Sequence, residues 1–292
     1  MNITIGIAQI DPVLGDVAAN LATHLAAAGQ ARAGGIDLLI FPELSLTGYR
    51  LGEMAYDVAI RATADDPTFA ALLGASDQVD LVVSFVEVDA RHRHTISAAY
   101  LSGGRLVHLH RKVYLPNYGQ WAEGRVFTPG QTARAFDTRF GRMGLLICED
   151  FWHASLPYLL WQDGADTLLL LSASVEHGQG DALTTADKVL AMNRAYALQF
   201  TTFVIHANRV GADDGGRYWG GSTIFGPDAA LLCEGPRDLP ALVVGGIDTA
   251  ALGPARRALP LLRDERPALV ARELRRILEK EEESTDFTDF TD

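Results

Sequence analysis

Cysteine is scarce, with only Cys148 and Cys233 among 292 residues. Two thiols are too few for a disulfide scaffold and suit a reducing compartment. No apolar run approaches the ~20 residues that a membrane span needs. The first residues, MNITIGIAQIDP, lack the basic segment of a signal peptide and indicate a strand instead. We therefore expect a cytoplasmic protein without a membrane partner.

Basic residues are also few. The sequence has 25 Lys and Arg but 37 Asp and Glu, which gives a net charge of −12. Residues 281–292 carry about half of that excess, and the remaining basic residues form only short pairs. Proteins that bind the phosphate backbone of nucleic acids present a basic patch. The charge pattern therefore excludes nucleic acid as an expected partner.

Internal repeats and Pro/Gly/Ser-rich linkers are absent as well, so we expect a single domain. Its composition, 48% hydrophobic and 21% charged, is typical of globular proteins, and a chain of this length can bury a large core. We place that domain at 1–266, a C-terminal helix at 267–283 and an acidic tail at 284–292. The tail is too polar to fold alone, although Phe287 and Phe290 could instead dock on a neighbouring subunit.

Apolar strand-like runs alternate with longer helical stretches. Strands are expected at 3–10, 36–41, 81–88, 95–110 with a turn at 102–104, 143–147, 167–172, 202–207, 222–233 with a turn at 226–228, and 243–247. Helices are expected at 20–32, 66–73, 155–163, 181–200 and 267–283. Alternation of strands and helices, with some hairpins, predicts a layered α/β fold.

Three polar residues follow apolar strands directly. Glu43 comes after IDLLIFP, Lys112 after GRLVHLHR and Cys148 after GRMGLLI. Ligands of α/β sheets collect beyond the carboxyl ends of the strands. The sequence therefore delivers a carboxylate, an ammonium and a thiol to a position where they could act together.

These three groups suit covalent catalysis. A free thiol is a poor nucleophile at neutral pH until a base or a cation favours its thiolate. A buried Glu43 could take the thiol proton and return it to a leaving amine. Lys112 and a backbone N–H beside Cys148 could hold the oxyanion, and helix-forming residues after Cys148 would favour the thiolate.

Each residue also has a structural interpretation. A single cysteine that closes a strand is usually a buried hydrophobe, a glutamate there is usually a cap, and Lys112 beside Arg111 is usually a surface charge. His153 is a rival base to Glu43, and Cys233 has no partner motif. The histidine pairs 92/94 and 108/110 lack a third ligand at convincing spacing, so we expect no metal.

The local sequences resemble the three signature blocks of the nitrilase, or carbon–nitrogen hydrolase, superfamily. The blocks are FPELSLTGY at 41–49, HRKVYLP at 110–116 and GLLICED at 144–150, with FTPG at 127–130 and YWGGS at 218–222 as further matches. Their order and spacings are also similar to those of the superfamily, and the resemblance spans about residues 3–266. Residues 1–266 are therefore expected to form a carbon–nitrogen hydrolase domain.

This resemblance implies a four-layer αββα sandwich without metal or organic cofactor. It makes Glu43 the general base, Lys112 the oxyanion partner and Cys148 the nucleophile, which forms a thioester that water hydrolyses. Glu123 matches a second, supporting glutamate, although it could also be a plain loop carboxylate. The family commonly self-associates, so a homo-oligomer, a dimer or higher, is expected.

Within the superfamily, LPNYG at 115–119 and CEDFW at 148–152 are most similar to the glutaminase domains of glutamine-dependent NAD synthetases. That similarity implies a substrate pocket lined by five residues. They are Tyr118, Trp121, Glu149, Trp152 and Ser174.

The chain departs from those glutaminase domains in two ways. It ends without an ATP-binding synthetase domain, and residues 175–180 lack the basic residue that holds the α-carboxylate of glutamine. Glu176 stands there instead and indicates an amine-bearing or neutral substrate. The sequence therefore looks like a stand-alone amidase.

Our hypothesis is a hydrolase that cleaves a small linear amide or N-carbamoyl compound through a Cys148 thioester and releases ammonia. Nitriles are the next candidate substrates. They rank below amides because Glu149 and Asp150 follow the nucleophile, where true nitrilases usually have Trp-Glu. Two alternatives remain open. The thioester could pass to an amine acceptor, as in an acyltransferase, or the fold could be a catalytically idle binding module, against which the intact residues argue.

Overall fold

The computed structural model describes residues 1–176 and 183–286, and for 281–286 only the backbone. The strands are β1 (Asn2–Gln9), β2 (Leu38–Ile40), β3 (Asp80–Val88), β4 (His94–Ser102), β5 (Arg105–Arg111), β6 (Phe136–Thr138), β7 (Gly141–Ile147), β8 (Thr167–Ser172), β9 (Phe203–Asn208), β10 (Val210–Asp213), β11 (Gly216–Trp219), β12 (Thr223–Phe225), β13 (Leu231–Glu234) and β14 (Ala241–Asp248). The helices are α1 (Val17–Ala33), α2 (Pro67–Ala75), α3 (Ser155–Gln162), α4 (Thr185–Phe200), α5 (Leu252–Ala258), α6 (Leu261–Asp264) and α7 (Pro267–Asp286), with 3₁₀ turns η1 (Gly52–Tyr56), η2 (Glu123–Arg125), η3 (Cys148–Phe151) and η4 (Thr249–Ala251).

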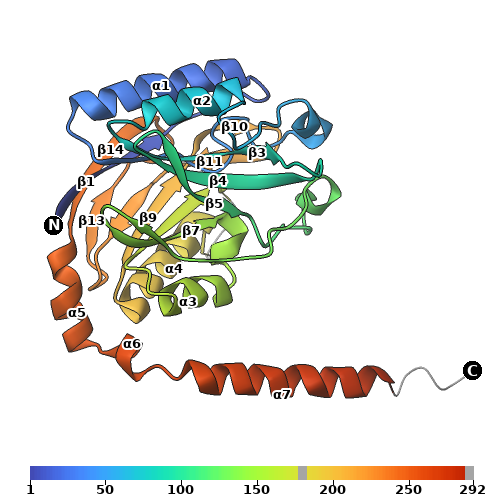
Figure 1. Cartoon of the computed structure of the whole chain (residues 1–292), viewed down its shortest axis with the longest axis vertical. Helices are drawn as coiled ribbons and strands as arrows, with labels where there is room; N and C mark the ends of the chain where they lie inside the picture. Colours follow the sequence, from blue (N-terminus) through green and yellow to red (C-terminus); the bar gives the residue numbers. More distant parts are fainter. Residues whose placement is uncertain (177–182, 287–292) are drawn as a thin grey trace, which may run out of the picture.

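Two six-stranded sheets stack face to face and are covered by helices on their outer faces (Figure 1). One sheet has the order β14-β1-β2-β3-β4-β5 and is covered by α1 and α2. The other has the order β13-β12-β9-β8-β7-β6 and is covered by α3 and α4. This arrangement confirms the predicted αββα sandwich.

Each sheet is built around three parallel strands, β1, β2 and β3 in one and β7, β8 and β9 in the other. The carboxyl ends of parallel strands share one edge of a sheet, where ligands collect. The chain leaves β2 toward Glu43, leaves β7 at Cys148 and leaves β8 at Ala173. The topology thus delivers these three residues to corresponding edges of the facing sheets.

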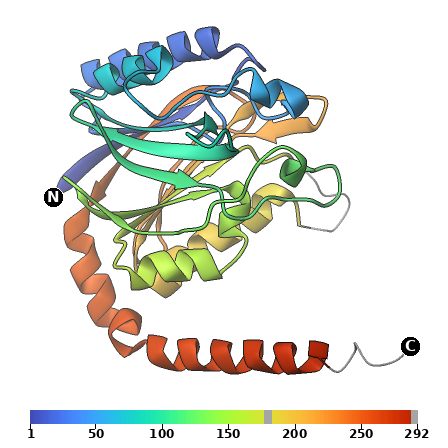
Figure 2. The ribbon, with the colours of Figure 1, turned by 45° about the vertical axis from the view of Figure 1, so that its right-hand side comes forward.

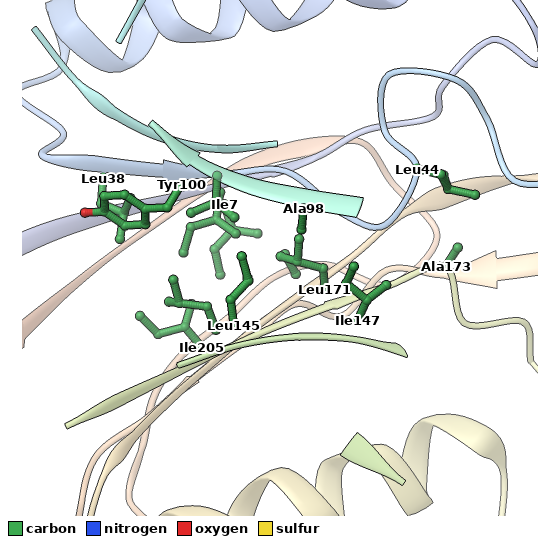
Figure 3. Packing of buried hydrophobic residues seen from close by; sticks show 14 of the residues in the cluster. Ile7, Leu38, Leu44, Ala98, Tyr100, Leu145, Ile147, Leu171, Ala173 and Ile205 are labelled. Atoms are coloured by element: carbon green, nitrogen blue, oxygen red, sulfur yellow. The ribbon is translucent and has the colours of Figure 1, made fainter. Parts of the chain in front are cut away.

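The interface between the sheets is a continuous apolar core (Figure 3). Ile7, Leu38 and Tyr100 face it from one sheet, and Leu145 and Ile205 face it from the other. All five side chains are almost fully buried. Burial of each such side chain stabilises the fold by roughly 1.5–3 kcal/mol, so the core holds the edges that carry the site in register.

Local sequence signals explain where the helices begin. The Asp16 side chain accepts the backbone N–H of Ala19, so α1 begins at Val17 rather than at the predicted residue 20. Thr184 and Asp187 form a reciprocal capping box at the start of α4. Helix α4 was predicted from residue 181, and residues 181–182 lie outside the described residues.

The sequence prediction missed several short elements, including β6, β10, β11, α5 and α6. Strands β10 and β11 form a hairpin of their own, in which Asp213 pairs with Gly216. Their polar, glycine-rich sequence has neither the alternation nor the apolar run that predicts a strand. The hairpins predicted at 102–104 and 226–228 are present, as β4–β5 and β12–β13.

Helix α7 extends away from the sandwich (Figure 2) and ends at Asp286, past the predicted residue 283. Residues 287–292, with Phe287 and Phe290, lie outside the described residues. Among the described helices, none is both long enough and apolar enough to cross a bilayer.

Candidate active site

The three residues predicted from strand ends meet at one edge of the sandwich. Lys112, which follows β5, places its Nζ 2.8 Å from Glu43 Oε1. The same Nζ lies 2.9 Å from Oε1 and 2.8 Å from Oε2 of Glu123, which begins η2. Lys112 and Glu43 have no exposed surface and Glu123 is buried, so the interpretation of Lys112 as a surface charge is wrong.

Glu43 is held through both of its carboxylate oxygens. Oε1 accepts a hydrogen bond from Lys112, and Oε2 accepts the backbone N–H of Ala173 at 2.9 Å, just after β8. The next residue, Leu44, has a φ of 48°, a conformation that costs energy for a residue other than glycine. The turn after β2 thus fixes this carboxylate between the two sheets.

Cys148 closes β7 and opens the 3₁₀ turn η3 with a φ of 46°. Left-handed backbone at a non-glycine residue persists only where the surroundings enforce it, and it is often found at functional sites. The side chain is half-buried and lines a cavity. The turn therefore brings the thiol to the wall of the cavity, where it also packs against the core.

The electrostatic surroundings favour the neutral thiol. Burial raises the pKa of Cys148 well above its usual value, the negative charge of Glu43 raises it further, and Lys112 opposes the shift. The expectation that a following helix favours the thiolate is not met, because η3 has only four residues and α3 begins at Ser155. A base is therefore needed to remove the proton.

The other buried members of the cluster shift one another's pKa values. Burial disfavours the charged form of Lys112, but Glu123 and Glu43 raise its pKa well above the usual value and keep the ammonium charged. Burial raises the pKa of Glu123 to about 7, with Lys112 opposing the shift. Tyr49 donates its hydroxyl to Glu123 Oε1 at 2.7 Å, and burial raises the pKa of Tyr49.

Asp150 connects the Lys112 segment to the Cys148 turn. Its Oδ1 accepts the backbone N–H groups of Val113 and Tyr114, both at 2.9 Å. Its Oδ2 accepts the backbone N–H of Ile147 at 3.1 Å and lies 2.8 Å from His110 Nε2. One fully buried carboxylate thus ties the end of β5 to the end of β7.

A second buried network supports the segment behind Glu43. Asn208 Oδ1 accepts the Ser172 hydroxyl at 3.0 Å and the backbone N–H of Ser174 at 2.9 Å. His206 Nε2 lies 2.7 Å from Ser172 Oγ, and burial lowers the pKa of His206 to about 3, so the ring is neutral. These bonds bracket Ala173, whose N–H contacts Glu43.

The cavity above Cys148 has a volume of about 270 Å³. All five residues predicted to bind substrate line it, as do seven others. The predicted residues are Tyr118, Trp121, Glu149, Trp152 and Ser174. The other lining residues are Tyr49, Pro116, Cys148, Ala173, Val175, Thr185 and Lys188.

Polar groups of both charges face this cavity. The Tyr118 hydroxyl donates to Glu149, at 2.9 and 3.1 Å from its two carboxylate oxygens. Lys188, an exposed residue of α4, supplies a positive charge to the wall. The walls are otherwise aromatic and aliphatic, a composition typical of small-molecule sites.

The expected role of Glu176 in substrate choice finds no support, because its carboxylate accepts the backbone N–H of Thr185 at 3.0 Å and it is not among the residues that line the cavity. Residues 177–180 of the same stretch lie outside the described residues. His153 precedes α3, stacks on Tyr114 and places its Nε2 3.7 Å from Glu149 Oε1. It therefore lies beside the substrate wall, whereas Glu43 belongs to the buried cluster.

Sequence reasoning missed Tyr49, Asp150, Asn208 and Lys188. Tyr49 and Asp150 lie inside the motifs at 41–49 and 144–150, where a signal was available. Asn208 and Lys188 lie outside every motif. Within the described residues, no three His, Cys, Asp or Glu side chains are grouped so as to hold a metal ion.

A family match over most of the chain agrees with this geometry. The model of the carbon-nitrogen hydrolase family matches residues 4–257. The chain belongs to the carbon-nitrogen hydrolase family. Membership confirms the predicted enzyme class for this domain, a hydrolase that acts on carbon–nitrogen bonds other than peptide bonds.

Two relatives and one solved structure are similar to this chain. An (R)-stereoselective amidase of Pseudomonas sp. is 34% identical over 86% of this chain and 87% of its own length. The glutamine-dependent NAD(+) synthetase of Acinetobacter baylyi is 28% identical over 80% of this chain, which spans only 42% of that relative's length. A crystal structure of Saccharomyces cerevisiae Nit3 shares the fold, with a TM-score of 0.78, 19% identity, and coverage of 89% of this chain and 95% of its own.

Proposed function

We propose that this carbon-nitrogen hydrolase cleaves a small linear amide or N-carbamoyl compound through a thioester on Cys148 and releases ammonia. The observation that carries the proposal is the buried Glu43–Lys112–Glu123 cluster next to a thiol held at a φ of 46° on the wall of a cavity. Burial of three charges is costly unless they serve one another or a reaction.

Acylation begins with proton transfer. Glu43 takes the Cys148 proton as sulfur attacks the carbonyl carbon, so a C–S bond forms and the carbonyl oxygen becomes an oxyanion. Lys112, already charged, donates a hydrogen bond to that oxygen. The C–N bond then breaks, Glu43 returns the proton to nitrogen, and ammonia leaves.

Deacylation repeats the same chemistry with water. Glu43 takes a proton from water, whose oxygen attacks the thioester carbon. The C–S bond then breaks and Glu43 returns the proton to sulfur, which releases the acid and restores both the thiol and the carboxylate. Glu123 keeps Lys112 in place through both of its oxygens and does not exchange protons with substrate. Cys148, Glu43 and Lys112 act as catalytic residues in this scheme, and Glu123 acts as a positioning residue.

The cavity supports a small substrate. Its 270 Å³ and its aromatic walls fit a short chain that lies between Tyr118, Trp121 and Trp152. The similarity to an (R)-stereoselective amidase over most of both chains supports an amide in preference to a nitrile. A homo-oligomer and a cytoplasmic location stay predictions, and size-exclusion chromatography with light scattering tests the first.

Ammonia release from primary amides, N-carbamoyl compounds and nitriles tests the proposal directly. We expect release by the unaltered chain, a loss of at least about 10³-fold in Cys148→Ala, and full retention in Cys233→Ala, a thiol outside the site. Activity that survives in Cys148→Ala overturns the thioester. Hydroxamate formed faster than acid in the presence of hydroxylamine favours the acyltransferase alternative.

A further inference from the structure

A second cavity of about 260 Å³ lies next to the catalytic one. Tyr49 and Trp121 form walls of both cavities, and Glu123 lines the second one from the buried cluster. The remaining wall residues are Arg50, Leu51, Gly52, Gln120, Ala122, Val126 and Phe127. The two cavities thus share two walls, and the second one contains an arginine.

Arg50 is unusual because its guanidinium lacks a close acceptor. Its side chain is 26% exposed, and its Nε and Nη2 atoms are buried without a hydrogen-bond partner among the described residues. The nearest carboxylate oxygen, Asp213 Oδ1, lies 3.9 Å from Nε, beyond hydrogen-bond distance. A buried donor left unsatisfied is costly, so this arginine is poised for an acceptor from outside.

Asp213 is already committed to other donors. Its Oδ1 accepts the backbone N–H of Gly215 at 2.9 Å, and its Oδ2 accepts the Tyr218 hydroxyl at 2.6 Å. Arg209 lies 3.8 Å from the same Oδ2. Asp213 therefore has its hydrogen-bonding partners within the hairpin itself.

The β10–β11 hairpin also fixes the position of Arg50. A side chain at Gly215 would collide with the guanidinium, so glycine there permits the close approach. Gln120 Nε2 donates to the carbonyl of Gly215 at 3.2 Å and holds the turn against the cavity wall. The hairpin therefore packs directly against one side of the guanidinium.

We propose that Arg50 binds a carboxylate at the far end of a linear amide substrate, an inference that rests on the proposed function. A guanidinium matches a carboxylate through paired, charge-assisted hydrogen bonds. Leu51, Val126 and Phe127 supply apolar walls for the methylene groups before it. The carboxylate already in the cavity, Glu123, is bound by Lys112, so Arg50 has only the long contact with Asp213.

The test compares two amides of equal length, the monoamide of adipic acid and hexanamide. We expect the unaltered protein to prefer the acid monoamide in kcat/KM. Arg50→Leu lowers kcat/KM for that substrate by about 10- to 100-fold, chiefly through KM, and changes hexanamide hydrolysis by less than about twofold. Arg50→Lys restores part of the loss because charge returns without the planar fork.

Arg217→Leu is the matched control, because Arg217 is an exposed arginine of the same hairpin, paired with Asp238 and outside both cavities. It leaves both substrates unaffected. Equal hydrolysis of the two amides by the unaltered protein, or an equal loss on both in Arg50→Leu, overturns the inference while amide hydrolysis itself still supports the proposed function.

Binding of adipate, measured by calorimetry, distinguishes failure of the carboxylate site from failure of the proposed function. Adipate that binds the unaltered protein and not Arg50→Leu supports the carboxylate site even if no amide is cleaved, in which case the proposed function fails alone. Adipate that inhibits hydrolysis of the acid monoamide competitively assigns the site to the substrate. Inhibition that is not competitive assigns it to a separate carboxylate ligand and overturns the substrate assignment.

Discussion

Glu123 is the side chain through which pH acts on the buried cluster. Burial raises its pKa to about 7, and its ionised form accepts from both Lys112 and Tyr49. We expect kcat/KM to fall below pH ~7, because protonation removes the acceptor that holds Lys112. Glu123→Gln keeps the shape, lowers kcat/KM by about 10- to 100-fold at pH 8, and removes this acid limb.

The same shift predicts a stability change. A carboxyl whose pKa rises from 4.5 to about 7 on folding binds more protons in the folded state between those values. The stabilisation from the protonated form is complete below pH ~4.5 and is lost as the pH rises through ~7. Denaturant titrations should therefore give a free energy of unfolding that falls across this window and falls less in Glu123→Gln. An equal slope in both proteins contradicts the assignment.

At the residue scale the sequence predicted the groups that we propose as catalytic but missed those that hold them. Glu43, Lys112 and Cys148 follow apolar strands, but it is their place in the three blocks that resemble the superfamily that selects them. Asn208 acts through the backbone of Ser174, 34 positions away. The unsatisfied Nε and Nη2 donors of Arg50 are visible only in the folded β10–β11 hairpin, because no sequence pattern reports an unsatisfied donor.

Asp150 connects β5 of one sheet to β7 of the other, so replacing it should lower both the activity and the stability of the protein. Asp150→Asn puts an amide N–H against backbone donors of the β5 and β7 ends, so buried hydrogen bonds are broken and not replaced. We expect kcat to fall by about 100-fold, because Lys112 and Cys148 lose their mutual position. The free energy of unfolding should fall by about 2 kcal/mol or more.

Single-turnover acylation and urea unfolding measure these two effects. Asp163→Asn is the control, since Asp163 is a partly exposed residue that pairs with Arg142 away from the cavity. It should change activity by less than about twofold. An Asp150→Asn protein that unfolds earlier but keeps its acylation rate would show that Asp150 serves stability alone.

Gly130 tests the connection between a loop and Lys112. Its N–H donates to the carbonyl of Lys112 at 2.7 Å, and an added Cβ would collide with the carbonyl of Arg111. Gly130→Ala should displace the end of β5, lower kcat by about 10-fold or more and destabilise the fold by about 1–3 kcal/mol. Gly29→Ala, in open space on α1, should instead stabilise the protein by about 0.5–1 kcal/mol and leave activity intact.

At the element scale, long apolar strands and capped helices were predictable and short polar ones were not. Strand β8, with its sequence TLLLLS, lies at the predicted 167–172. Strands β10 and β11 also make tertiary contacts, since Arg209 stacks over the ring of Tyr218 in β11. Such tertiary contacts override weak local propensity.

In the whole molecule, the alternation of strands and helices along the sequence predicts the four layers. It does not predict which residues meet at the edges of the sheets. Each sheet must bury both faces, one against the other sheet and one against a helix pair, which leaves the αββα order as the stable solution. Residues from distant segments then meet at the edge: Glu43 follows β2, Lys112 follows β5, Cys148 follows β7 and Ala173 follows β8. Pairing of the sheets is a global property that no single segment encodes.

Helix α7 lies outside this packing, which leads to the last prediction. None of its described residues belongs to the buried core, and Leu274, Ile277 and Leu278 are exposed. A chain ending at residue 266 should therefore keep a melting temperature within about 3 °C, the equivalent of about 1 kcal/mol for a domain of this size. Its kcat/KM should stay within about twofold, as measured by thermal denaturation and ammonia release. A large loss of either property, together with a change of mass in light scattering, would show that the exposed face of α7 packs on a second copy of the chain and belongs to the functional assembly.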